Sequence, residues 1–518
     1  MVKPVIACLL IALAGSAQNK PAEKTVEQLE ADKRDPKLRG EALLENASAL
    51  TASVKPETQV ATLMHLGANY QTIDRKKAID YLRQAFTASS ALADHPSVGA
   101  RGHAQASIIG EMSNLDTGEA ISMLRQMEAP AKGYDRRSEA AASIIAALAK
   151  RKDFDGAIGV VDTLAGSGVF PYNAAQGLFK ELPAEDPRRL GLFASATSAY
   201  SAKQNNQFAD LLVACWDGLP EQMAQTALDT LVKQILNLKD DDHYTTTTIS
   251  SAKGGVHFDN VAEAELFKVM ALVQRVSPEK AKEILDGHLA LRSAMDQFPG
   301  GQQSMGQTGV SMGSGGGKPS SEAQMKAKLR ALSESRGAAA MAALAESPQK
   351  ALSLVNDIPL PEVKASTLGA IARSVSDKDP VTATAALTKC IALLDDLKDP
   401  SNTTEIWADV ASAAHQSGDD KIARMALERS LADAGALFKK DTDEDGPNNA
   451  LREQWPSTNA YRRTMISAAK VLGVDAEPML DQIKDPDMRV LAQIELAQAL
   501  LGRPHNRWST SVSRSTKK

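Results

Sequence analysis

Residues 66–85 read LGANYQTIDRKKAIDYLRQA, and this stretch decides the fold. It places two small residues, Gly67 and Ala78, among large apolar side chains such as Leu66 and Leu82. Two helices can approach closely only where their side chains are short. The stretch therefore predicts a pair of helices that cross at Gly67 and Ala78.

A similar phrase recurs further along the chain. It reads KAIDYLRQ at 77–84, EAISMLRQ at 119–126 and GAIGVV at 156–161, and its alanines are 42 and 37 residues apart. More divergent copies lie at 280–285, 350–354 and 422–427. A two-helix unit that recurs about every 35 to 42 residues is typical of an α-solenoid. The alternative is an irregular bundle of helical hairpins.

Apolar residues elsewhere also follow the period of a helix. Ala141, Ile144, Ile145 and Leu148 fall at i, i+3, i+4 and i+7, which places them on one helix face. Four helix starts combine a capping side chain with a proline, at Ser277-Pro278, Ser347-Pro348, Asp379-Pro380 and Asp485-Pro486. Alternation of β-branched and polar residues is nearly absent, so we expect an all-α protein without a sheet.

The first unit resembles the tetratricopeptide repeat. Leu66-Gly67-Ala68-Asn69-Tyr70 matches the L-G-x-x-Y phrase of that family's first helix, and Ala78, Leu82 and Ala85 match the small, large and small positions of its second helix. The resemblance implies a superhelical array of antiparallel helix pairs and a role in binding proteins or peptides. The later units keep the small residues but lack the tyrosine.

The N-terminus has the three parts of a secretory signal. Lys3 precedes an apolar run over 5–13, and the small residues Ala14-Gly15-Ser16-Ala17 follow. We expect residues 1–17 to be a signal peptide, cleaved near Ala17, and the protein to be periplasmic or extracellular. The alternative is an uncleaved anchor, but the segment is shorter than the roughly 20 residues that a bilayer needs.

The rest of the chain divides at a glycine-rich stretch. Residues 299–320 hold eight glycines and one charged residue, Lys318, and we expect a flexible linker there. It separates helical-repeat regions at 25–298 and 321–502, and a basic tail at 503–518 is expected to be disordered. Within the first region, 239–258 is expected to be a long surface loop, because it contains three aspartates, four threonines and a Gly-Gly pair.

Composition limits the class of protein. Of the 518 residues 43% are hydrophobic, 24% are charged and 4% are aromatic, and the net charge of −5 arises from interspersed residues of both signs. Such a chain offers no positive field to nucleic acid, and no apolar run is long enough to span a membrane. After cleavage two cysteines remain, Cys215 and Cys390, and we expect two buried thiols rather than a disulfide framework.

One local pattern suggests a metal site. Asp441, Asp443, Asp445 and Gly446 occupy positions 1, 3, 5 and 6 of a calcium loop. Position 12, which should be glutamate, is Arg452. Calcium at Asp441, Asp443 and Asp445 is a hypothesis, and the alternative is a solvated acidic turn between two helices.

No catalytic signature is present. The eight histidines form no zinc motif, and a G-x-S-x-G match at 309–313 lies in the glycine-rich stretch, without the strand and helix that a nucleophile elbow needs. We therefore expect a non-enzymatic scaffold with a protein or peptide partner and no cofactor.

Two alternatives remain. One is an envelope enzyme acting on glycans, for which aromatic and charged residues concentrate only at 455–463. An inter-repeat packing contact would equally explain that cluster. The other is a calcium-stabilised adhesion or assembly factor.

Overall fold

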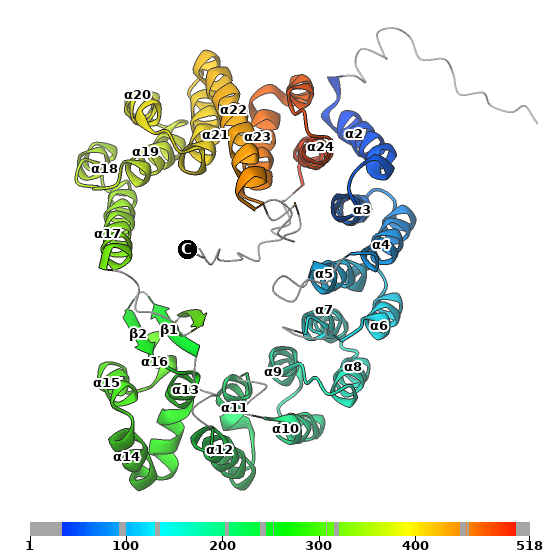
Figure 1. Cartoon of the computed structure of the whole chain (residues 1–518), viewed down its shortest axis with the longest axis vertical. Coiled ribbons are helices and arrows are strands. Elements are labelled where there is room, and N and C mark those ends of the chain that lie inside the picture. Colours follow the sequence, from blue (N-terminus) through cyan, green and yellow to red (C-terminus); the bar gives the residue numbers. More distant parts are fainter. Residues whose placement is uncertain are drawn as a thin grey trace, which may run out of the picture.

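A computed structural model describes the chain at residues 34–92, 100–129, 135–201, 207–238, 245–251, 253–306, 308–314, 321–445, 452 and 455–503. This part is mainly helical, which confirms the all-α prediction (Figure 1). None of its helices has the length and apolar character needed to cross a membrane. The predicted signal peptide and the tail beyond Arg503 lie outside the described residues.

The helices are numbered in chain order. Those before the glycine-rich stretch are α2 (Pro36–Leu50), η1 (Thr51–Ser53), α3 (Pro56–Tyr70), α4 (Arg75–Ser89), α5 (Ala100–Leu115), α6 (Thr117–Gln126), α7 (Arg137–Lys150), α8 (Phe154–Gly166), α9 (Tyr172–Glu181), α10 (Arg188–Ala199), α11 (Phe208–Cys215), η2 (Trp216–Gly218), α12 (Glu221–Leu236), α13 (Val261–Val276), α14 (Pro278–Gly287) and α15 (Leu289–Gln297). Those within or after it are α16 (Gln302–Met305), α17 (Ser321–Ala343), α18 (Pro348–Val355), α19 (Pro361–Val375), α20 (Pro380–Asp396), α21 (Pro400–Gln416), α22 (Asp420–Asp445), α23 (Pro456–Leu472), η5 (Gly473–Gln482) and α24 (Pro486–Leu500).

The helices follow one another around a ring with a central opening (Figure 1). In the first arc, α5, α7, α9, α11 and α13 form an inner layer, and α6, α8, α10, α12 and α14 lie outside them. Each inner helix packs on the next inner helix, and the second arc continues this pattern through α17, α19, α21 and α23. Alternate helices therefore build the wall around the opening.

The crossing predicted at Gly67 is confirmed. A Cβ atom at Gly67, on α3, would lie 2.6 Å from Cγ of Leu82 and 3.2 Å from the carbonyl oxygen of Ala78, both on α4. Ala78 and Leu82 are fully buried. The small residue of the repeat phrase thus sets how closely the two helices of the first unit approach.

Replacing Gly67 with alanine tests this contact. We expect the variant to lose about 1 to 3 kcal/mol of stability, because overpacking outweighs the higher helix propensity of alanine. Gly159→Ala on α8 is the matched control, since nothing lies within 4 Å of a Cβ atom there, and it should be neutral or stabilising. Urea denaturation of both variants measures the difference, and equal effects would contradict a tight crossing at Gly67.

Helix starts also follow the sequence prediction. The side chains of Ser347, Asp379 and Asp485 accept hydrogen bonds from the first amides of α18, α20 and α24, each with proline in the first turn. Ser277 precedes α14 in the same way but makes no such side-chain bond. Three of the four predicted caps are therefore confirmed.

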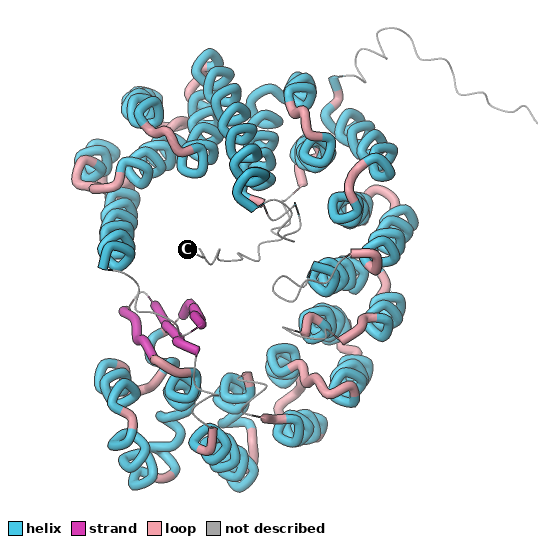
Figure 2. Tube along the Cα trace, in the orientation of Figure 1, coloured by secondary structure: helices cyan, strands magenta, loops and turns pink. Residues whose placement is uncertain are grey.

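The prediction that no sheet is present is wrong. Strands β1 (Thr245–Ser251), β2 (Gly254–Phe258) and β3 (Thr308–Ser314) form an antiparallel sheet in the order β2-β1-β3 (Figure 2). Ile249 and Phe258 are fully buried, and the ring of Phe258 lies 5.5 Å from that of Phe267 on α13. Four consecutive threonines favour a strand because they are β-branched, and Gly254 takes a positive φ at the turn.

Two segments that the sequence predicts to be irregular contain regular secondary structure. The segment 239–258, expected to be a loop, contains β1 and β2, and the expected linker at 299–320 contains α16 and β3. The register Ile249↔Val310 shows that β3 belongs to the same sheet as β1. Pairing with a distant strand therefore orders a stretch whose glycines suggested a linker.

The two cysteines of the described chain match the prediction. Cys215 and Cys390 are free and buried, and burial raises the pKa of each thiol to about 12. The Cys390 thiol donates to the carbonyl oxygen of Ala365 at 3.2 Å. Both residues act as small core side chains, without a disulfide.

Candidate functional site at the closure of the ring

The ring closes through a helix pair that combines both ends of the described chain. Helix α2 packs on α24, side by side as two helices of one repeat do (Figure 1). At Gly40 a Cβ atom would lie 2.8 Å from Cγ of Leu501 and 3.0 Å from the carbonyl oxygen of Ala497, so the two helices approach closely. The side-chain amide of Gln493 donates to the carbonyl oxygen of Leu43 at 2.7 Å.

Three helices begin near the same point of this closure. Helices α3, α23 and α24 each have proline in the first turn, at Pro56, Pro456 and Pro486. The backbone N–H of Lys55, just before α3, donates to Oδ1 of Asp487 in the first turn of α24, at 3.1 Å. The partial positive charge at the start of a helix favours carboxylates there.

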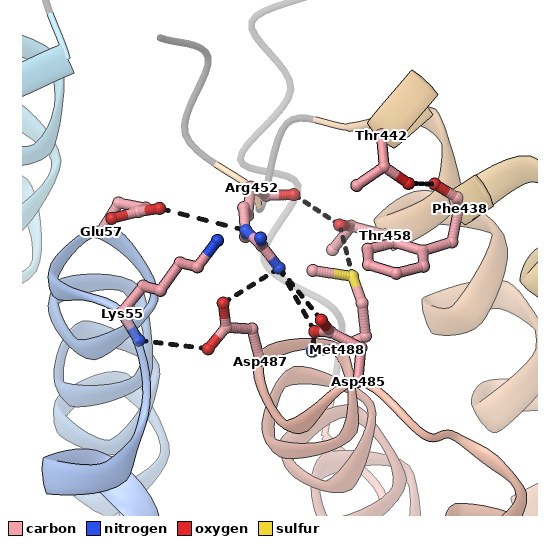
Figure 3. Close-up of polar contacts among 9 residues, drawn as sticks. All are labelled: Lys55, Glu57, Phe438, Thr442, Arg452, Thr458, Asp485, Asp487 and Met488. Atoms are coloured by element: carbon pink, nitrogen blue, oxygen red, sulfur yellow. Dashed lines mark hydrogen bonds and ion pairs between the residues drawn. The ribbon is translucent and has the colours of Figure 1, made fainter. Parts of the chain in front are cut away.

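Arg452 neutralises the carboxylates of Glu57, Asp485 and Asp487, which lie at the starts of α3 and α24 (Figure 3). Its Nη1 atom lies 2.9 Å from Oδ2 of Asp487 and 3.2 Å from Oδ1 of Asp485, and its Nε atom lies 3.9 Å from Oε1 of Glu57. The side chain of Arg452 is 7% exposed and that of Asp487 is 3% exposed. One buried arginine therefore joins α3, near the N-terminus, to α24, near the C-terminus. We call Arg452, Glu57, Asp485 and Asp487 the clasp.

Two aromatic rings support the clasp. The guanidinium carbon of Arg452 lies 5.1 Å from the ring centre of Trp455 and 5.9 Å from that of Phe438. The hydroxyl of Thr458 donates to the carbonyl oxygen of Arg452 and contacts the sulfur of Met488 at 3.3 Å (Figure 3). The rings and Thr458 thus contact the side chain and the backbone of Arg452, respectively.

The clasp explains the two patterns that the sequence singled out. Arg452, the residue that breaks the calcium motif, is its centre, and Trp455 is the first member of the aromatic and charged cluster at 455–463. In that cluster Nε of Arg462 donates to Glu495 of α24 at 2.7 Å, and Arg463 lies 3.4 Å from Glu405 of α21. Two arginines of the cluster thus connect α23 to α24 and to α21.

The predicted acidic turn is helical instead. Helix α22 continues to Asp445, and the carboxylate of Asp441 is buried and accepts the backbone N–H of Ser457, in the first turn of α23, at 2.9 Å. The side chains of Asp443 and Asp445 lie outside the described residues, so calcium binding there stays a prediction. Within the described part of the chain, no three His, Cys, Asp or Glu side chains gather closely enough to hold a metal ion.

A second charged cluster, which the sequence did not indicate, lies on two inner helices. On α13, Nζ of Lys268 lies 2.9 Å from Oε1 of Glu265 and 2.9 Å from Oδ2 of Asp210 on α11. Burial raises the pKa of Glu265 to about 7, although Lys268 opposes this rise. Burial disfavours the charge of Lys268, but the two carboxylates outweigh it and raise its pKa. In the sequence, the one feature that could indicate this cluster is the i, i+3 spacing of Glu265 and Lys268.

The raised pKa of Glu265 predicts a pH-dependent stability. Between the ordinary glutamate pKa of 4.5 and about 7, the native state holds a proton that the unfolded chain has released. The free energy of unfolding should therefore fall by about 1 to 3 kcal/mol as the pH rises through this window. Glu265→Gln should remove this fall, whereas Glu283→Gln on the outer helix α14 should retain it. Denaturation of each variant at pH 5 and pH 8 gives the comparison, and an unchanged slope in Glu265→Gln would contradict the assignment.

Comparison with known proteins gives little further guidance. No protein-family model matches this chain, and no curated protein matches it. Among solved structures, the crystal structure of Ton1535 from Thermococcus onnurineus NA1 is 13% identical over 88% of this chain and 99% of that chain, with a TM-score of 0.19. A TM-score this low supports no argument about fold or function, so the proposal that follows rests on the residues described above.

Proposed function

We propose that this protein is an exported, non-enzymatic scaffold that binds a protein or peptide on the inner wall of its ring. The observation that carries the proposal is the inner layer of helices, which presents an extended wall toward a central opening (Figure 1). Stacked helix pairs provide extended concave surfaces of this kind for polypeptide partners. The predicted export signal at 1–17 supports a place in the cell envelope or outside it.

The exposed positions of the inner helices support a polypeptide partner. They include Asn173 and Lys180 on α9, Ser366 and Arg373 on α19, and Glu405 on α21. These exposed side chains include neutral polar groups and charges of both signs, and Arg373 and Glu405 pair with Asp409 and Arg463. Such a mixed surface suits the backbone amides and mixed side chains of a polypeptide. The uniform negative charge of a nucleic acid would require a positive surface instead.

Site-specific photo-crosslinking tests the proposal. A photoreactive residue is introduced at Asn173 or Ser366 on inner helices and, as matched controls, at Asp162 or Thr388, which are exposed on the outer helices α8 and α20. The variants are expressed in cells with the export signal intact. We expect one polypeptide species to be crosslinked from both inner positions and from neither outer position. Equal crosslinking from inner and outer positions, or none from the inner positions, would contradict binding at the inner wall.

A further inference from the structure

Helix α17 begins the second arc and is only partly covered. In its second half, Ser333, Gly337 and Ala340 are buried where α17 packs on α18 and α19. The approach there is close, since a Cβ atom at Gly337 would lie 2.9 Å from Oγ1 of Thr367. The first half of the helix extends beyond this contact.

Three large apolar side chains lie exposed on that first half. Met325 is 71% exposed, Leu329 is 39% exposed and Leu332 is 45% exposed. They fall at i, i+4 and i+7 and so form one stripe on the helix. At helical spacing the same line continues through Arg336 and Ala339, which are exposed, to Ala343, which is buried. The buried face of Ser333, Gly337 and Ala340 lies roughly a quarter turn around the helix from this stripe, so the stripe is a separate apolar face of α17.

Basic residues flank this stripe. Lys326 and Lys328 are exposed, and their positions place them on opposite sides of the line through Met325, Leu329 and Leu332. The next basic residue, Arg330, is paired with Glu334 at 2.9 Å on the same helix. The surface therefore combines an apolar centre with a positive margin.

From this juxtaposition we infer that the first half of α17 is a docking site for an acidic amphipathic helix of a partner protein. Helices elsewhere in the wall pack on one another, and an apolar stripe at i, i+4 and i+7 fits the apolar face of another helix. Glutamates beside the apolar face of the partner helix would pair with Lys326 and Lys328.

The charge and length of the surface favour this occupant over two others. A second copy of α17 would bring like charges together. A helix that binds a bilayer surface presents an amphipathic face along its whole length, whereas this stripe covers about 10 Å, or two turns. Because α17 is one of the inner helices, the inference deepens the proposed function and rests on it. The stripe is separate from the positions crosslinked above, so the peptide titration and the crosslinking can each fail alone.

Binding of designed peptides to the full-length chain tests the inference. The probe is a fluorescent helical peptide of about 18 residues, with leucines at i, i+3, i+4 and i+7 and glutamates on both margins. A second peptide carries lysine at every glutamate position. We expect the acidic peptide to bind at least about tenfold more tightly than the basic one in an anisotropy titration at low salt.

Variants of α17 make the result specific. The triple substitution Met325→Ser, Leu329→Ser, Leu332→Ser should abolish binding, and Lys326→Glu with Lys328→Glu should reverse the preference between the peptides. Val381→Ser on α20, where the side chain is 80% exposed, is the matched control and should change nothing. Circular dichroism verifies that each variant remains helical.

Three results would overturn the inference. The first is binding of the acidic peptide that survives the triple substitution. The second is binding to vesicles containing phosphatidylglycerol that depends on the stripe, which would make the partner a membrane. The third is dimerisation in analytical ultracentrifugation that disappears in the triple variant, which would make the partner a second copy.

Discussion

Replacing Arg452 with alanine is expected to lower the stability of the closure by about 3 to 5 kcal/mol. The arginine is 7% exposed and compensates Asp487, which is 3% exposed and has little access to water. Without Arg452 the carboxylates of Asp487, Asp485 and Glu57 would face one another with no positive partner in the clasp. The loss of a buried charge partner is among the most costly single substitutions.

The loss should be localised as well as large. Large proteins open in separate cooperative units, so hydrogen exchange should accelerate in α3 and α24 before it does so in α7 or α9. Arg463→Ala is the control, since its pair with Glu405 is about half exposed on both sides and is worth about 0 to 1 kcal/mol. Urea denaturation measures the loss of stability, and peptide-resolved hydrogen exchange shows which helices open. If the two variants behave alike, the clasp does not hold the ring.

Removal of α24 should have the second large effect. A chain that ends at Asp485 would lose the helix against which α2 packs, and Leu43, Leu44 and Ala47 of α2, all buried in the intact chain, would lose this cover. Exposing a leucine costs about 1.5 to 3 kcal/mol, so the two leucines alone account for about 3 to 6 kcal/mol. Helices α2 and α3 should then exchange rapidly, and the molecule should expand.

A shorter truncation controls for loss of the basic tail. Ending the chain at Arg503 leaves α24 complete and should change neither exchange in α2 nor the hydrodynamic radius. Size-exclusion chromatography with light scattering, combined with hydrogen exchange over 36–70, compares the two truncations. A chain lacking α24 that keeps its radius and its protection in α2 would show that the ring does not depend on this helix pair.

The sequence predicted the helical units because their determinants are local. Gly67 and Ala78 lie within one repeat, and the caps at Ser347, Asp379 and Asp485 act within one helical turn. A repeated local pattern is also what an array of helix pairs requires. The all-α fold could therefore be predicted from spacing alone.

The sheet could not be predicted because the composition of its strands is typical of a loop. The threonines of β1 and the glycines of β3 are polar or small, and alternation is visible mainly in burial, at Thr247 and Ile249. The pairing of Ile249 with Val310 joins residues that are far apart in the chain. Glycine content alone gives no sign of such a partner.

The closure was missed for a similar reason. Arg452 and Glu57 lie near opposite ends of the chain, so no local spacing connects them. In the sequence, Arg452 stands at the glutamate position of a calcium motif and does not fit it. In the structure, its guanidinium forms ion pairs with Asp485 and Asp487. Helices α3 and α24 bury polar as well as apolar residues, for example Asn69 and Gln493, which weakens the amphipathic signal.

The central claim is that both ends of the described chain form one helix pair, α2 with α24, that closes a ring. Small-angle X-ray scattering of the purified chain in dilute solution tests this claim most directly. The account predicts a scattering curve that the closed ring of Figure 1 fits, with a distance distribution typical of a hollow particle. A longer maximum dimension, fitted only by an open arc with α2 apart from α24, would contradict it.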